Sequence, residues 1–173
     1  MSDLRERLQK LLVPQFPHAE LDEYERQIAR KYKNAYNAFY RDQKRTKCGT
    51  RLMEITTAVK KEANTKSVWQ SYILCKAFLL GALFEARPKA LDNLDRIRRY
   101  LATFKPNGKV GSLYFEKDRS EMIDLGDLLE KRLDRERNPE FIKETWFFHC
   151  TTSWPVRLTD EWLEQTTVTS EKI

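Results

Sequence analysis

Apolar residues along most of the chain recur at every third or fourth position, the spacing of one face of an α-helix. The pattern predicts a first helix after Ser2 and Asp3, whose side chains can accept hydrogen bonds from the free amides of a first turn. Pro14 and Pro17 then end this helix, because proline lacks the amide hydrogen that a helix interior needs. Its predicted buried face consists of Leu4, Leu8, Leu11 and Leu12.

A longer second helix is predicted from about residue 19 to residue 44. Its apolar positions share one face and are Leu21, Tyr24, Ile28, Tyr32, Ala35 and Phe39. We expect a turn at residues 48–50 (CGT), followed by a third helix that ends near Asn64.

The most apolar stretch, residues 68–86, is predicted to be a buried central helix that Ser67 can cap. It approaches the length of a membrane-spanning segment, but Gln70, Lys76 and Glu85 interrupt it. We therefore favour burial inside the protein over a position in a membrane.

The chain after residue 86 mixes helix and strand signals. Pro88 suits the first turn of a fifth helix, and the loop at residues 105–109 (KPNGK) follows it. Residues 112–116 (SLYFE) are predicted to form a strand, and a helix capped by Asp118 and Glu121 to run from there to Asn138 and Pro139. A second strand at residues 145–154 is expected to pair with the first. The predicted fold class is mainly α: a single-domain helical bundle of about five to seven helices, to which a small β-hairpin can be added.

Charge divides the chain into a basic part and an acidic part. Residues 1–109 hold 23 Lys and Arg against 12 Asp and Glu, and residues 110–173 hold 9 against 14, for a net charge of +6. We treat residues 1–173 as one domain, with a basic helical part (1–109), an acidic and aromatic part (110–165) and a frayed tail (166–173). This asymmetry indicates that a polyanion contacts the first part and that the second packs into the core or against a protein partner.

The cations of the second helix gather on one face. On a helical wheel a basic stripe falls within an arc of about 80°, opposite the apolar face, and it consists of Arg26, Arg30, Lys33, Asn37, Arg41 and Lys44. From Arg26 to Lys47 there are eight cations and one acid, whereas solvated helices commonly place Glu four residues before Lys or Arg. Tyr36 and Tyr40 border the stripe, where they are predicted to stack on unpaired bases.

We predict that the basic stripe binds RNA or single-stranded DNA through the phosphate backbone, without reading sequence. Its cations and Arg45 would contact phosphates, and Asn37 would donate a hydrogen bond. Two smaller clusters are candidates for extending this surface. One consists of Lys60, Lys61 and Lys66, and the other of Arg96, Arg98 and Arg99. A solvated helix face and a binding site for an acidic protein remain as other interpretations of the stripe.

Residues for catalysis are scarce. His149 and Cys150 are neighbours in a predicted strand, so their side chains would point to opposite faces and could not act as base and nucleophile. The three cysteines show no CxxC spacing, which indicates reduced thiols in a cytoplasmic protein rather than disulfides or a zinc site. We therefore predict no enzymatic activity, no metal or cofactor and no small-molecule substrate.

The basic segment RQIARKYKNAYNAFYRDQKRTK (residues 26–47), within a mostly helical chain of this size, resembles the small helical subunits of CRISPR effector complexes. The resemblance lies in this helix and in the overall architecture. It implies a non-catalytic, cytoplasmic subunit of a ribonucleoprotein in antiviral defence, which steadies RNA or DNA strands beside other protein subunits. The two predicted strands depart from that all-helical pattern and leave a different ribonucleoprotein open.

Two functions of other kinds remain as alternatives. One is a protein adaptor whose basic helix binds an acidic partner. The other is a DNA-binding regulator with a helix-turn-helix motif at residues 55–73 (ITTAVKKEANTKSVWQSYI), although the second helix of that motif is strongly apolar.

Overall fold

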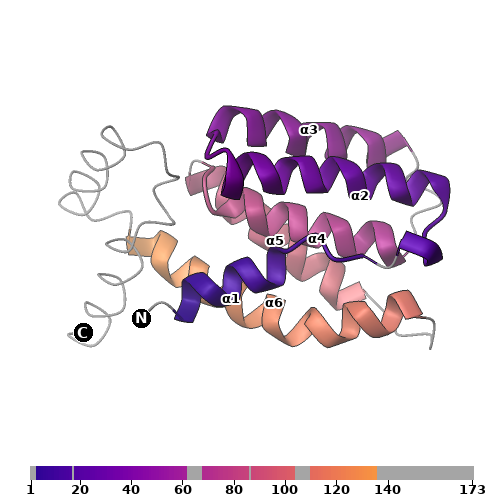
Figure 1. Cartoon of the computed structure of the whole chain (residues 1–173). Coiled ribbons are helices and arrows are strands. Elements are labelled where there is room, and N and C mark those ends of the chain that lie inside the picture. The colour runs from indigo at the N-terminus through magenta and orange to yellow at the C-terminus, as the bar shows by residue number, and fades with distance from the viewer. Residues whose placement is uncertain (1–2, 17, 62–67, 86, 104–109, 136–173) are drawn as a thin grey trace.

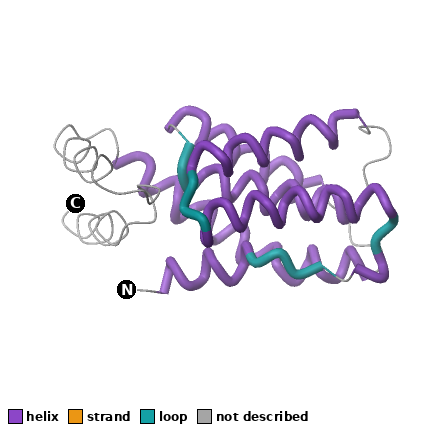
Figure 2. The backbone as a smooth tube through the Cα atoms, turned by 45° about the horizontal axis from the view of Figure 1, so that its top comes forward, coloured by secondary structure: helices purple, strands orange, loops and turns teal. Residues whose placement is uncertain are grey.

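The computed structural model describes residues 3–16, 18–61, 68–85, 87–103 and 110–135, and within these ranges the chain is helical apart from short connections (Figure 2). Two short elements, a 3₁₀-helix η1 (His18–Glu20) and a π-helix η2 (Asn37–Arg41), flank the second helix. The α-helices are α1 (Asp3–Leu12), α2 (Glu23–Tyr36), α3 (Arg45–Lys61), α4 (Val68–Ala82), α5 (Arg87–Thr103) and α6 (Val110–Arg135). The predicted helical bundle is confirmed, and the described ranges contain no strand.

The helix α4 lies at the centre of the bundle. From Trp69 to Phe84 every residue except Ser71 is buried, because apolar side chains leave this segment in all directions. The helices are arranged in layers, with α2 and α3 on one side of α4 and α5, and with α1 and α6 on the other (Figure 1). In the part of the chain that the structure describes, no helix has the length and apolar character needed to cross a membrane.

The start of α2 is fixed by a capping box, four residues after the predicted start. The Asp22 carboxylate accepts a hydrogen bond from the Glu25 backbone N–H at 2.8 Å, and the Glu25 carboxylate accepts one from the Asp22 N–H at 3.1 Å. These two bonds satisfy amides that have no partner within the helix. The preceding residues form η1 instead of the first turn of a longer helix.

The turn between α2 and α3 lies at residues 42–44, so the prediction of a turn at residues 48–50 is wrong. Gln43 has a φ of 54°, in the left-handed region, and the Lys44 N–H then donates to the Ala38 carbonyl at 2.8 Å. Cys48 and Gly49 lie inside α3. The Cys48 side chain is fully buried, and an added Cβ at Gly49 would lie 3.7 Å from the Phe84 ring, so packing against the core keeps this segment helical.

The strand predicted at residues 112–116 is also wrong, because these residues belong to α6. Phe115 is fully buried, with its ring centroid 5.7 Å from that of Tyr72 on α4. It continues a helically spaced buried face whose other members are Met122, Leu125, Leu129 and Leu133. Packing along this whole face therefore outweighs the strand-like composition of five residues.

Asp118 and Glu121, which were predicted to cap a helix, lie in the interior of α6. The Tyr72 hydroxyl donates to the Asp118 carboxylate, and Arg7 on α1 donates to the Glu121 carboxylate through Nε at 3.2 Å. Both carboxylates therefore join α6 to neighbouring helices. The predicted loop at 105–109, the helix end at 138–139 and the strand at 145–154 lie outside the described residues.

A charged side chain, Lys76, is buried beside α1. Lys76 on α4 is 3% exposed, and its Nζ donates to the Val13 carbonyl at 3.0 Å. The same Nζ lies 5.2 Å from the centroid of the Phe16 ring and 4.8 Å from that of the Tyr72 ring, which attract a cation through their faces. Burial lowers the pKa of Lys76 to about 8, although the negative charge of Asp118 acts in the opposite direction and raises this pKa. Lys76 thus connects the segment after α1 to the central helix.

We expect Lys76→Met to change how stability depends on pH. The pKa of Lys76 is about 8 in the folded protein and 10.5 in an unfolded chain. Between these values the unfolded state binds more protons, so the free energy of unfolding of the wild type rises with pH. Relative to the Met variant, this rise should be about 2 kcal/mol between pH 7.5 and 9.5.

Urea denaturation of both proteins across this pH range measures the effect. Taking the difference between the two proteins cancels the titration of cysteines and tyrosines that they share. A difference that does not change with pH would show that Lys76 is not buried as a lysine of lowered pKa.

Candidate nucleic-acid interface

The predicted two-faced character of α2 is confirmed. Arg30 and Lys33 are exposed on the outer face, as are Arg41 and Lys44 beyond the end of α2, while Arg26 and Asn37 are half-buried. The opposite face packs against α3 and α4 and contains the buried residues Ile28, Ala29, Tyr32 and Ala35. The basic stripe is therefore carried by a helix that the core holds in place.

The π-helix η2 changes the course of the basic stripe after Tyr36. The Asp42 N–H donates to the Asn37 carbonyl, five residues earlier, at 2.9 Å. Each residue of a π-helix turns the chain around the helix axis by less than the roughly 100° of an α-helix. The side chains after Tyr36 therefore lie at smaller angles around the axis than an α-helical wheel predicts. Lys44 follows the left-handed Gln43 and lies beyond the helix. The continuous helical part of the stripe thus ends at Arg41, roughly 22 Å from Arg26.

This change of phase brings Tyr40, the second of the two bordering tyrosines, against the core. The rings of Tyr36 and Tyr40 contact each other with centroids 4.8 Å apart, and Tyr40 contacts Phe39 at the same distance. The Tyr40 hydroxyl oxygen is buried and has no hydrogen-bond partner within the described ranges. Burial is the main cause that raises the pKa of Tyr40 above its ordinary value. Both tyrosine side chains are half-buried. The buried hydroxyl of Tyr40 does not favour its predicted stacking on bases, and the role of Tyr36 stays a prediction.

Acidic side chains lie beside part of the basic stripe. The Arg30 guanidinium is 3.4 Å from the Glu23 carboxylate, and that of Arg41 is 3.2 Å from the Asp42 carboxylate. The Asp42 carboxylate also lies 3.7 Å from Lys47. The hydrogen bond from Arg41, together with the nearby cations, lowers the pKa of Asp42. A search for acids four residues before each cation misses Glu23, which lies seven residues before Arg30.

These ion pairs leave the stripe available to an anion. The side chains of Arg30 and Arg41 are 58% and 74% exposed, and exposed ion pairs contribute little to stability. Lys33 and Lys44 are also exposed, and neither has an ion pair among the residues that the structure describes. A phosphate can therefore replace the carboxylates without disturbing the core.

The smaller cluster on α5 has a different environment. Arg96 lies 3.1 Å from Asp92, and Arg99 lies 3.0 Å from Asp95, each pair within the same helix. Arg98 donates to the Asp127 carboxylate on α6 at 3.0 Å. Arg98 joins α5 to α6, whereas the ion pairs of Arg96 and Arg99 are exposed and lie within α5, as that of Arg30 lies within α2. The predicted contact of Arg96 and Arg99 with nucleic acid therefore stays a prediction. The side chains of Arg45, Lys60, Lys61 and Lys66 lie outside the described part of the chain.

The described part of the chain contains two cysteines, and neither is a ready nucleophile. Cys48 and Cys75 are buried free thiols, and burial raises the pKa of each to about 12, so neither forms a thiolate at neutral pH. Within the described ranges no three His, Cys, Asp or Glu residues come together in a way that could hold a metal ion. His149 and Cys150 lie outside those ranges.

The chain matches no family model, no curated protein and no solved structure. Its resemblance to small CRISPR subunits therefore stays a prediction, and the function has to be proposed from its own residues.

Two tyrosines in this region should respond in opposite ways to loss of the hydroxyl group. Tyr32 is fully buried and its hydroxyl donates to the Leu12 carbonyl at 2.5 Å, so Tyr32→Phe should lower the free energy of unfolding by about 1–2 kcal/mol. Tyr40→Phe removes a buried hydroxyl that makes no hydrogen bond, and it should leave stability unchanged or raise it.

Urea denaturation of the two variants is a matched comparison, because the chemical change is the same in both. Equal losses of stability would mean that the Tyr40 hydroxyl has a hydrogen-bond partner. This would contradict its placement as a buried hydroxyl without one.

Proposed function

We propose that this protein binds RNA or single-stranded DNA without catalysis, through contacts between the basic stripe and the phosphate backbone. The observation that supports the proposal best is the division of α2 into a face fixed in the core and a face rich in exposed cations. Because α3 and α4 hold the helix from behind, little backbone has to become ordered when a strand binds.

The residue types of the stripe suit phosphate binding. The guanidinium groups of Arg30 and Arg41 can donate two parallel hydrogen bonds to a phosphate, and Lys33 supplies a point charge between them. Phosphate contacts position a strand but carry no sequence information. Binding by this surface is therefore expected to be independent of base sequence.

The short length of the stripe indicates that the protein acts beside other subunits. A few cations neutralise few phosphates, so the isolated chain should bind weakly and lose its affinity quickly as salt is added. A place in a larger ribonucleoprotein, such as a CRISPR effector complex, would supply the remaining contacts. An acidic protein partner would use the same cations, and the following experiment separates the two.

We expect the wild type to bind a 30-nucleotide strand of mixed sequence, in RNA or DNA form, at low salt. Fluorescence anisotropy across a series of salt concentrations gives the slope of log K against log salt. Each lost phosphate contact on a single strand reduces this slope by about 0.7, so Arg30→Gln with Arg41→Gln should reduce it by about 1.4.

The matched control is Lys89→Gln on α5 with Lys117→Gln on α6. It removes the same charge from two cations that are also exposed, of which Lys89 is 61% exposed and ion-paired with Glu85. The control should keep the wild-type slope. Absence of binding at low salt, or an equal effect of the two double variants, would contradict the proposal and favour an acidic protein as the partner.

A further inference from the structure

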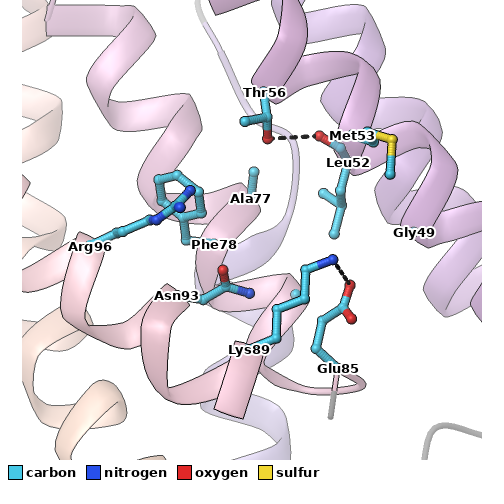
Figure 3. Close-up of a pocket in the computed structure, with 11 residues that line it drawn as sticks. Gly49, Leu52, Met53, Thr56, Ala77, Phe78, Glu85, Lys89, Asn93 and Arg96 are labelled. Atoms are coloured by element: carbon cyan, nitrogen blue, oxygen red, sulfur yellow. Dashed lines mark hydrogen bonds and ion pairs between the residues drawn. The ribbon is translucent and has the colours of Figure 1, made fainter. Parts of the chain in front are cut away.

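A cavity of about 150 Å³ opens between α3, α4 and α5 (Figure 3). None of its lining residues belongs to α2, so it is separate from the basic stripe. Its apolar wall is formed by Leu52, Met53, Ala77 and Phe78. A cavity of this volume can hold a ring of the size of benzene.

Two uncharged polar side chains line this cavity, Asn93 and Thr56, and the Thr56 hydroxyl already donates to the Leu52 carbonyl at 3.1 Å. Asn93 is 8% exposed, and no hydrogen bond of its amide is found among the residues that the structure describes. Figure 3 shows the amide pointing from α5 into the space below Ala77 and Leu52. The oxygen and nitrogen of the amide are both accessible from the cavity, so a ligand that enters it can form hydrogen bonds with them.

Gly81 on α4 makes room for this amide. A Cβ at position 81 would lie 2.8 Å from Asn93 Nδ2, closer than such atoms approach each other. The absence of a side chain on one helix therefore allows a polar side chain from another helix to lie against it. Two helices thus cooperate in presenting one donor and one acceptor to the cavity.

The charged residues at the cavity are paired with acids. Lys89 lies 3.5 Å from Glu85, and Arg96 lies 3.1 Å from Asp92 while its guanidinium covers the Phe78 ring at 5.5 Å from the centroid. The entrance carries an apolar residue as well, because Met53 is 65% exposed. The site is close to neutral, and this favours an uncharged ligand over an anion.

We propose that this cavity binds a small, uncharged, planar ring that carries a carboxamide or lactam edge. Such an edge places an acceptor beside a donor and can satisfy both groups of the Asn93 amide at once. A carboxylate has acceptors only and would leave the Asn93 oxygen facing another oxygen. The ring itself fits the wall of Leu52, Ala77 and Phe78. The proposal does not depend on nucleic-acid binding by α2.

The test is a titration of the ¹⁵N-labelled protein with benzamide, followed by NMR. The side-chain NH₂ signals of Asn93 should shift, and benzoate, which has the same shape, should bind at least about tenfold more weakly. Absence of a shift of these signals at the highest soluble benzamide concentration would overturn the proposal. Equal or tighter binding of benzoate would overturn it too, since the cations would then select the ligand.

Two variants test the roles of the residues. Asn93→Leu keeps the size of the side chain but removes the amide, and Gly81→Ala displaces the amide; each should weaken benzamide binding by about tenfold or more. Arg99→Gln, also on α5 but outside the cavity, should leave it unchanged. Wild-type affinity in a folded Asn93→Leu variant would overturn the proposal. The comparison of benzamide with benzoate on the wild type decides the matter if a variant fails to fold.

Discussion

The enclosure of α4 is the physical constraint on which the rest of the structure depends. A helix that is apolar on every side has to be covered on every side, so each surrounding helix must give one apolar face to it or to its neighbours. The remaining faces are left for solvent and for partners. The exposed face of α2 is polar because its other face is committed to this core, and its cations are accessible there. Lys76 shows the strength of the constraint, since its charge lies against aromatic rings and one carbonyl instead of water.

Much of the fold could be predicted from apolar spacing, because α1, α2, α4 and α5 each show a clear face or a continuous apolar run. Two of the errors, the turn at residues 48–50 and the strand at residues 112–116, have local causes. Gln43 takes the left-handed conformation at the true turn, and a glutamine gives no signal of it, whereas Gly49 looks like a turn residue but packs inside α3. Residues 112–116 have a strand-like composition, and only the burial of Phe115 against Tyr72 shows that they continue α6.

The candidate sites also contain features that could be predicted from the sequence and features that could not. The opposed faces of α2 follow from helical periodicity, so Arg30 and Lys33 could be placed correctly. The π-helix could not be foreseen, and it turns the Tyr40 hydroxyl toward the core. Asn93 looked like an ordinary helix residue, because its significance depends on Gly81 of a neighbouring helix. Contacts between distant parts of the chain are therefore what sequence reasoning missed.

The most direct test of the central claim is lysine acetylation, followed by mass spectrometry, with and without a bound 30-nucleotide single strand. The described chain has exposed lysines on α2 and in the turn after it, and others on α5 and α6, which serve as internal controls. If the basic stripe binds the strand, Lys33 and Lys44 will be protected while Lys89, Lys117 and Lys131 react as before. Protection of the α5 and α6 lysines with Lys33 and Lys44 still reactive would contradict the account.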